Sequence, residues 1–261
     1  MKQGLLAGLI GVGALALLAG CDVRVDLPKG DAAPPPAVEA LASCVLPDRL
    51  PAPRMERVRA DEVVADRTIL FHMLAVTWMP QTCKTGGDGK GDLACGSENR
   101  FGWTLHGLWP NADGKPYPRY CRPAEQVDAA TIRANLCRTP SVDLVQHEWA
   151  AHGVCGWDSP QAYFADAARL YDGLNKPDPT ALSSGLSSGG RGPTAGRLRD
   201  AFVAANPGLP RNAVYIAVAS GNQLREVRIC HDLEFKPAPC PVGGLGTPDR
   251  VVLTVEPVAG R

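Results

Sequence analysis

Two short stretches of the chain gather side chains that could do acid–base chemistry. One contains His106, and the other contains His147, Glu148 and His152. Three of the five histidines therefore fall inside these two stretches. Histidine is the side chain whose unperturbed pKa lets it give or take a proton near neutral pH. The pattern indicates a base and an acid working on two sides of one reacting group.

The second stretch is predicted to lie on a helix over residues 142–152, because Ser141 is a suitable N-cap and Gly153 a suitable stop. Helical spacing predicts an apolar stripe and a second stripe that carries both imidazoles and the carboxylate. A merely solvated face would more typically carry Lys, Arg and Glu. The apolar stripe is Val142, Val145 and Trp149, and the second is Leu144, His147, Glu148, Ala151 and His152.

A metal site is the first alternative, because His147-Glu148 matches the start of the zinc motif H-E-x-x-H. His152, however, comes one residue too late for that motif. On a regular helix a spacing of five separates two side chains by about 140°, against about 40° for a spacing of four. The chain also has no C-x-x-C pair, the usual spacing of cysteine ligands. We therefore expect no metal and no cofactor.

The composition excludes several classes of protein. The 261 residues carry 27 Lys+Arg against 27 Asp+Glu, and 45% of them are hydrophobic. This much apolar material can bury a core, so disorder of the whole chain is excluded. Zero net charge also excludes binding to a polyanion through a broad basic surface. Any polyanion must be gripped locally by a few side chains.

The N-terminus predicts export and lipidation. Residues 1–20 have the charged start and apolar run of a signal peptide, and L-L-A-G-C at 17–21 resembles the lipobox of bacterial lipoproteins. Removing Cys21 from the nine cysteines leaves eight, an even number that suits disulfides in an oxidising compartment. The alternative is an ordinary cleaved signal with Cys21 as a free thiol. Residues 21–43 are predicted to form a Pro/Ala-rich tether, and residues 44–261 the folded domain.

Local patterns predict an α+β fold rather than a regular βαβ series. Residues 68–78 are apolar and rich in β-formers, as expected for a buried strand. Ser159-Pro160 favours a helix start, and residues 213–219 and 223–232 flank a hairpin turn. Residues 183–192 are rich in Ser and Gly and are predicted to form a loop.

The two reactive stretches resemble the active-site segments of the ribonuclease T2 family, in the same order along the chain. They read T-L-H-G-L-W-P at 104–110 and H-E-W-A-A-H-G-V-C at 147–155. A weaker match is E-V-R-I-C at 226–230, with Cys240 ten residues on. The resemblance covers about residues 68–240. It implies an α+β domain in which helices pack on a central antiparallel sheet stabilised by disulfides.

The resemblance also implies an activity, which is metal-independent endonucleolytic cleavage of RNA with little base preference. The 2′-hydroxyl would attack its own phosphodiester, and water would open the 2′,3′-cyclic phosphate to a 3′-phosphate. By this resemblance His152 would be the general base and His106 the general acid. His147 would hold the phosphate and Glu148 would stabilise the transition state. Because DNA lacks the 2′-hydroxyl, it would not be cleaved.

Base-binding residues follow from the same resemblance. Trp109, Asn111 and Tyr117 match the family's base-contacting positions, and aromatic faces stack on any base. Trp109 could equally be a core residue, whereas Trp149 belongs to the apolar stripe and is predicted to be core. His72 is interpreted as a core histidine because it lies in the apolar strand.

Spacing alone leaves the disulfide connectivity open, since eight cysteines allow 105 pairings. The resemblance implies two of the pairs, and the remaining four cysteines are then assigned as the least strained arrangement. The implied pairs are Cys121–Cys155 and Cys230–Cys240, and the assigned pairs are Cys83–Cys95 and Cys44–Cys137.

One residue departs from the family pattern. Ala151 stands where the family usually has a lysine that neutralises charge on the phosphoryl oxygens. Losing such a contact commonly costs about a hundredfold in rate. Another cation could substitute, and the candidates are Arg119, Arg122 and Lys115.

Two other function classes therefore stay open. The first is a weakened or inactive relative that binds RNA or a protein through the inherited cleft, for which Ala151 is the reason. The second is a structural lipoprotein of the cell envelope. Retention of the three histidines and Glu148 argues against both. We expect a monomer on the periplasmic side of a bacterial envelope, attached to the membrane only by its lipid. A secreted or soluble periplasmic protein is the alternative location.

Overall fold

The computed structural model describes residues 44–85, 93–183, 192–241 and 245–258. The predicted signal peptide, the lipidation site Cys21 and the tether lie outside the described residues, as does most of the predicted loop at 183–192. None of the helices in the described ranges is long and apolar enough to cross a membrane.

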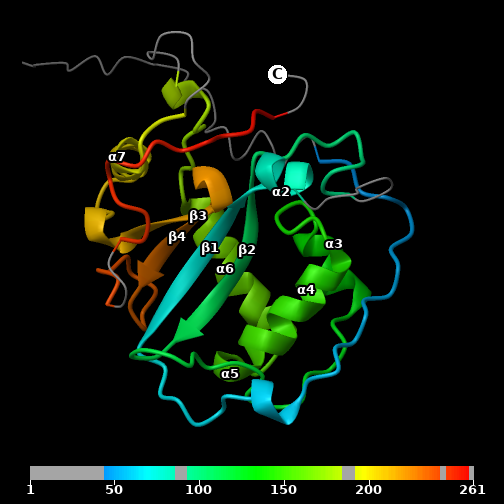
Figure 1. Ribbon diagram of the computed structural model, residues 1–261. Helices are drawn as coiled ribbons and strands as arrows, with labels where there is room; N and C mark the ends of the chain where they lie inside the picture. Colours follow the sequence, from blue (N-terminus) through cyan, green and yellow to red (C-terminus); the bar gives the residue numbers. More distant parts are fainter. Residues whose placement is uncertain (1–43, 86–92, 184–191, 242–244, 259–261) are drawn as a thin grey trace, which may run out of the picture. The chain divides into compact units, whose positions relative to one another are not determined.

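A four-stranded antiparallel sheet forms the centre of the domain, with strand order β2-β1-β4-β3 (Figure 1). Leu74 and Val76 of the second strand in that order are fully buried, as the apolar run predicted. The predicted hairpin is present, and Gly221 and Asn222 turn it with φ values of 69° and 57°. The strands are β1 (Phe71–Trp78), β2 (Trp103–Asn111), β3 (Val214–Ala219) and β4 (Gln223–His231).

Helices pack against this sheet, which confirms the α+β class. The longest, α6, begins at Pro160, where the Ser159 hydroxyl accepts a hydrogen bond from the Ala162 N–H at 3.2 Å. Its residues Tyr163 and Phe164 are buried in one core with apolar residues of β1 and β2. The helices are α2 (Met79–Thr85), α3 (Ala129–Asn135), α4 (Val142–Glu148), η2 (Trp149–Gly153), α5 (Val154–Gly156), α6 (Pro160–Gly173) and α7 (Ala195–Ala205). Short 3-10 turns are η1 (Ala60–Glu62), η3 (Ala181–Ser183), η4 (Arg211–Ala213) and η5 (Ser220–Asn222).

The helix predicted over residues 142–152 starts as expected but is neither regular nor stopped by Gly153. Ser141 caps α4 by accepting from the Leu144 N–H at 3.2 Å. The helix then widens into the π-helical turn η2 and continues through α5 to Gly156. Gly153 serves close packing, since a Cβ there would lie 2.3 Å from the Trp149 ring. Predicting a stop at this glycine was wrong because its role is steric room inside the helix.

Four disulfides close the domain, and they join the pairs expected from the sequence. They are Cys44–Cys137, Cys83–Cys95, Cys121–Cys155 and Cys230–Cys240. The Cys121–Cys155 disulfide joins the segment after β2 to α5, which directly follows the π-helical turn in the chain. Such links stabilise mainly by restricting the unfolded chain.

Candidate active site

A β-bulge presents His106 from β2. Along the β1–β2 ladder Ala75 pairs with Gly107 and Val76 pairs with Leu105, so His106 is the residue left without a partner. A bulge of this kind turns a side chain away from the regular alternation of a strand. The imidazole of His106 is 23% exposed, which leaves it accessible at the surface of the sheet.

Two carboxylates flank the His106 ring. Nδ1 lies 2.6 Å from Glu226 Oε1 on β4, and Nε2 lies 3.4 Å from Glu148 Oε1 on α4. A carboxylate only accepts, so Nδ1 carries the hydrogen and Nε2 remains for other chemistry. Burial opposes protonation, but the charge of Glu148 and then the contact with Glu226 raise the pKa of His106 above 6.5. His106 is therefore protonated more readily than a free imidazole.

Glu226 is a site residue that sequence reasoning left without a role. It is 1% exposed, and Arg228 holds its second oxygen through Nε and a terminal nitrogen at 2.9 and 2.7 Å. Burial raises the pKa of this carboxyl, but the His106 hydrogen bond and charge and then Arg228 lower it to about 2. The E-V-R-I-C match contained both residues. Glu226 and Arg228 reach His106 only because β1 pairs with both β2 and β4. Ala75 of β1 is paired with Gly107 on one side and with Arg228 on the other.

His147 and His152 meet because of the π-helical turn. Their ring centroids lie 6.3 Å apart with planes nearly perpendicular. The i→i+5 hydrogen bonding of a π-helix places residues five apart one above the other, and such turns often occur at functional sites. Burial and then the positive charges of His147 and His106 lower the pKa of His152 well below 6.5. His152 is therefore neutral near pH 7.

Glu148 lies buried between the histidines and β2. Its Oε2 accepts from Trp109 Nε1 at 2.9 Å, and burial raises the pKa of the carboxyl. Gly107 makes the room for it, because a Cβ there would lie 1.8 Å from Glu148 Oε2. Within the described ranges no hydrogen-bond partner reaches Glu148 Oε1 or His152 Nδ1. Both unpaired polar atoms lie in the site, where a bound group could satisfy them.

The sequence argument against a metal assumed a regular helix, and on that point it was wrong. Ligand atoms of His147, Glu148 and His152 lie within 4.8 Å of one another. The π-helical turn brings together what a regular helix would separate. Two imidazoles and a carboxylate could hold a divalent cation, and the two imidazoles could bind a phosphate oxygen.

A cavity of about 630 Å³ opens beside these groups. The Trp109 ring lies at its edge, 5.5 Å from the His152 ring and 4.9 Å from the Arg228 guanidinium carbon. Trp149, by contrast, is fully buried, which confirms its place in the core. The three residues matched to base binding all line the cavity, which is formed by Phe71, Met73, Trp109, Pro110, Asn111, Lys115, Tyr117, His152, Tyr215 and Arg228.

The two other histidines lie away from this cavity. His72 on β1 is 6% exposed and packs against the Phe235 ring at 4.8 Å, which agrees with its interpretation as a core histidine. His231 is paired with it across β1 and β4 and is also buried.

Two of the three cations that the sequence suggested lie near the site, because Lys115 lines the cavity and the charge of Arg119 reaches His152. Ala151 is 1% exposed and packs with Tyr120, so its side chain does not face the cavity openly. Arg122 is engaged elsewhere, over the Trp149 ring and on the Trp157 carbonyl. Arg119 remains, and its charge contributes to the low pKa of His152. Arg228 is an additional cation that sequence reasoning missed.

The arrangement can carry out acid–base chemistry at one centre. His106 and His152 both flank Trp109, with ring centroids 5.1 and 5.5 Å from its own. Their environments push their pKa values in opposite directions. Such a separation assigns the acid to the group with the raised pKa and the base to the other.

Comparison with known sequences finds one matching family. The model of the ribonuclease T2 family matches residues 69–240. A protein named probable ribonuclease from Haemophilus influenzae is 35% identical over 122 residues, which is 41% of this chain and 44% of that relative. The ribonuclease T2 protein rnst-2 of Caenorhabditis elegans is 25% identical, over 57% of this chain and 59% of its own. These matches thus span only about half the length of the curated relatives.

Solved structures show the same fold. An RNase-related protein from Calystegia sepium has a TM-score of 0.57 at 21% identity, over 72% of this chain and 97% of its own. RNase NT, solved with 5′-AMP, has a TM-score of 0.57 at 21% identity, over 73% of this chain and 100% of its own. At this identity the likeness concerns the fold alone.

Proposed function

The chain belongs to the ribonuclease T2 family, and from that premise we propose that it is an endoribonuclease that cleaves RNA through a 2′,3′-cyclic phosphate. In the first step neutral His152 takes the proton of the 2′-hydroxyl while the 2′-oxygen forms a bond to phosphorus. The bond from phosphorus to the 5′-oxygen breaks, and protonated His106 gives its Nε2 proton to that leaving oxygen. In the second step the roles reverse, as water opens the cyclic phosphate to a 3′-phosphate.

The observation that carries this proposal is the opposite shift in pKa of two histidines whose rings both flank Trp109. The pKa of His106 is raised by Glu148 and Glu226, and the pKa of His152 is lowered by burial. Relative to a free imidazole, His106 is thus shifted towards the protonated acid and His152 towards the neutral base that the first step needs. Acid and base contributions of this kind are each worth about two to four decades in rate.

The phosphate would lie between these imidazoles, on His147 and Glu148. Both end α4 directly before the π-helical turn, and Glu148 Oε1 and His152 Nδ1 are buried without a hydrogen bond in the described part of the chain. The Glu148 carboxylate would act there by holding the protonated His106 beside the leaving oxygen, since its charge raises the pKa of that imidazole.

Low base preference is the finer part of the proposal. Trp109 and Tyr117 offer aromatic faces in the cavity, and stacking on such faces does not read the base. Asn111 is the polar exception, but its amide donates to the Trp109 carbonyl at 2.9 Å and is 4% exposed. Its main task would then be to hold the end of β2 rather than to select a base.

The test is cleavage of RNA by the purified chain in the presence of EDTA, alongside His106→Ala and His152→Ala. We expect the parent to produce cyclic phosphate and then 3′-phosphate ends, to leave DNA intact and to be unaffected by the chelator. Each variant should lose at least a hundredfold in kcat. Activity that survives in both variants would overturn the mechanism, and loss of activity in EDTA would overturn its metal independence.

A second candidate function rests on Ala151, which leaves out the cation usual for the family. A weakened or inactive relative would still bind RNA or a protein through the cavity. It is distinguished by RNA binding without cleavage in the same assay, measured by fluorescence anisotropy with labelled RNA.

Location belongs to the proposal as well. The apolar N-terminus and the lipobox-like string ending at Cys21 support a lipid-anchored protein on the periplasmic side of a bacterial envelope, acting as a monomer. Incorporation of a fatty-acid label that disappears in Cys21→Ser would support the anchor. Release of an unlabelled chain would favour a secreted or soluble periplasmic protein instead.

A further inference from the structure

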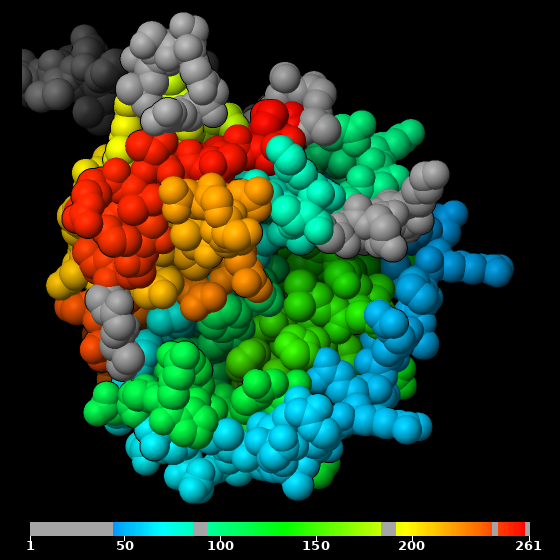
Figure 2. Space-filling model, in the orientation of Figure 1, coloured from blue at the N-terminus to red at the C-terminus, as the bar shows by residue number. Residues whose placement is uncertain are grey.

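The described chain begins with a stretch that lies outside the match to the family, and that stretch reaches the candidate active site. We call residues 44–64 the N-terminal segment. The family match starts at residue 69, so no role carried over from the family covers this segment. Its path follows the side of α4 in Figure 1, and Figure 2 shows its blue and cyan residues beside a green part of the surface.

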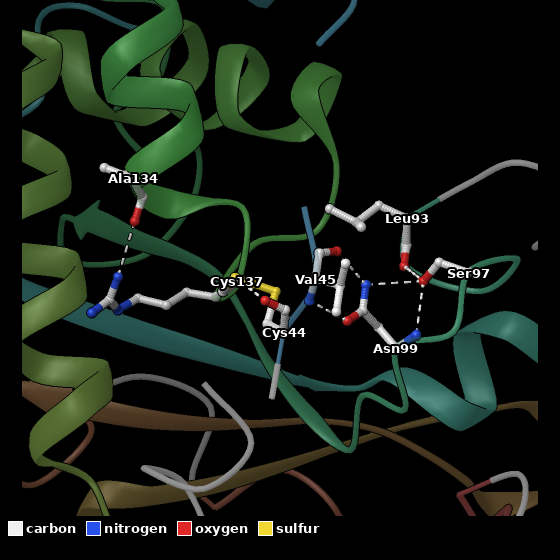
Figure 3. Close-up of a disulfide and its surroundings, with 8 residues drawn as sticks. Cys44, Val45, Leu93, Ser97, Asn99, Ala134 and Cys137 are labelled. Atoms are coloured by element: carbon white, nitrogen blue, oxygen red, sulfur yellow. Dashed lines mark hydrogen bonds between the residues drawn. A yellow bond between two sulfur atoms is a disulfide. The ribbon is translucent and has the colours of Figure 1, made fainter. Parts of the chain in front are cut away.

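The start of the N-terminal segment is fixed covalently. Cys44 is joined to Cys137, and the next residue is clamped by Asn99, as Figure 3 shows. The Val45 N–H donates to Asn99 Oδ1 at 2.8 Å, and Asn99 Nδ2 donates to the Val45 carbonyl at 2.9 Å. These contacts hold the segment against the domain before it passes α4.

Hydrogen bonds hold the rest of the segment at two points, one before and one after Glu56 in the chain. Upstream, the N–H and the guanidinium of Arg54 donate to Asp143 in the first turn of α4, at 2.8 and 2.7 Å. Downstream, Val64 and Arg119 exchange backbone hydrogen bonds at 2.9 and 3.1 Å. Glu56 therefore lies between two fixed points.

Glu56 makes contact with the phosphate side of the site. Its Oε1 accepts from Nδ1 of His147, and its Oε2 accepts from the Tyr120 hydroxyl at 2.9 Å. Tyr120 is held in turn, because its N–H donates to the Ala151 carbonyl in the π-helical turn at 2.9 Å. It also adopts φ of 50°, a conformation uncommon for a residue with a side chain and frequent at functional sites.

This contact sets which nitrogen of His147 is free. A carboxylate only accepts, so Nδ1 of His147 carries a hydrogen and Nε2 is the atom left for a ligand. The side chains of Glu56 and His147 are 30% and 34% exposed, and an ion pair so exposed adds little to stability. The main effect of the Glu56 contact is therefore to orient the His147 imidazole.

We propose that Glu56 is a positioning residue, and that the N-terminal segment completes the phosphate-binding half of the active site by fixing His147. The proposal rests on the proposed function for its kinetic consequences, but its structural core concerns phosphate binding alone. Partners that orient metal-ligating histidines are typically worth about 10- to 100-fold in affinity or activity. We expect Glu56→Gln to weaken binding of inorganic phosphate about tenfold.

The experiment titrates the purified full chain and its variants with inorganic phosphate while ¹⁵N NMR follows the His147 ring nitrogens. In the parent, Nδ1 of His147 should be protonated and Nε2 should respond to phosphate. In Glu56→Gln, hydrogen should redistribute between the two nitrogens and the phosphate Kd should rise about tenfold, with KM for RNA rising more than kcat falls. The matched control is Glu62→Gln, in the same segment but bonded to the Arg59 N–H, which should bind phosphate as the parent does.

Each result decides between named possibilities. Unchanged phosphate binding and an unchanged ring state in Glu56→Gln would overturn the proposal, and so would tighter binding, which would mean that the carboxylate competes with phosphate. A fold defect is recognised by thermal unfolding, and Arg54→Gln then serves as the second variant, since it loosens the segment and leaves Glu56 in place. It should weaken phosphate binding in the same direction. Should the parent bind phosphate through His147 but cleave no RNA, the proposed function fails while this inference stands.

Discussion

His152 follows His147 by five residues, yet their rings meet edge to face with centroids 6.3 Å apart. The π-helical turn between Trp149 and Gly153 is the cause, because it stacks residues that a regular helix would turn away from each other. His106 reaches the same centre from a β-bulge. Both local irregularities thus serve to bring imidazoles together, one in a helix and one in a strand.

The first prediction concerns the pH profile of RNA cleavage. Activity needs neutral His152 and protonated His106, so kcat/KM should be level between the lowered pKa of His152 and the raised pKa of His106. In Glu226→Gln the His106 ring loses a charge that raises its pKa. The high-pH limb should therefore move to lower pH while the low-pH limb stays in place. Initial rates on a dinucleotide substrate across pH 4–9 measure both limbs, and a shift of the low-pH limb alone would contradict the assignment.

The second prediction concerns the cation that replaces the missing lysine. Arg119 lies close enough for its charge to lower the pKa of His152. We expect Arg119→Ala to reduce kcat about tenfold to a hundredfold, because charge growing on the phosphoryl oxygens loses a positive neighbour. Arg122→Ala is the matched control, since Arg122 is engaged with Trp149 and Trp157 and should leave kcat near the parent value.

A second variant, Ala151→Lys, tests the missing cation by restoring the lysine that is usual for the family. Ala151 is 1% exposed under Tyr120, so a lysine placed there must displace that ring before it can reach phosphate. Ala151→Lys should therefore give no gain in kcat and should lower the melting temperature. A large gain in turnover would instead show that the site lacks a cation and that Arg119 does not supply it.

Much of the site could be predicted because its histidines sit in two continuous strings. The fold class, the hairpin and the apolar strand were equally local patterns and are confirmed. Glu226 and Glu56 could not be found in this way. They lie 120 and 91 residues from the histidines they contact, and a lone glutamate in a strand or an extended segment carries no sign of its partner.

The error about the helix has a different physical origin. Ser141 was read correctly as a cap because capping depends on a few adjacent residues. The π-helical turn instead depends on packing of Trp149 against Gly153 and the core, which no spacing rule contains. Assuming a regular helix then made the angle between His147 and His152 too large, and so made a shared ligand look impossible.

The third prediction concerns Gly107, the residue that follows the bulge. A Cβ at this position would lie 1.8 Å from Glu148 Oε2 and 2.9 Å from Trp109 Nε1. Gly107→Ala should therefore expel the Glu148 carboxylate from its contact with Trp109 and reduce kcat at least tenfold. Overpacking of this kind also costs about 1–3 kcal/mol in free energy of unfolding.

A matched glycine distinguishes this steric effect from a general effect of replacing glycine. Gly173 ends α6, and a Cβ there would meet nothing within 4 Å. Gly173→Ala should leave kcat unchanged in the same assay and should not lower the free energy of unfolding. If Gly107→Ala behaved like Gly173→Ala, then the contact between Gly107 and Glu148 would not constrain the site.

The fourth prediction concerns stability in acid and depends on His231. Burial and the nearby charge of His72 lower the pKa of His231 from 6.5 to about 4, although its hydrogen bond with the Ile229 carbonyl acts in the opposite direction. The unfolded chain therefore binds a proton on this residue at a higher pH than the folded chain does. The contribution of His231 to the free energy of unfolding is therefore fully present above about pH 6.5 and is lost as the pH falls towards 4. The shift corresponds to about 3 kcal/mol in free energy of unfolding.

Urea unfolding at pH values between 7 and 4 measures this loss. In His231→Leu no proton can bind at this position in either state, so the decline between pH 6.5 and 4 should be smaller than in the parent by about 3 kcal/mol. Carboxylates titrate in both proteins and cancel in the comparison. His72, whose pKa is also lowered by burial, should add a smaller effect of the same sign in the double variant. Parallel curves for parent and His231→Leu would show that His231 titrates alike in the folded and unfolded chain.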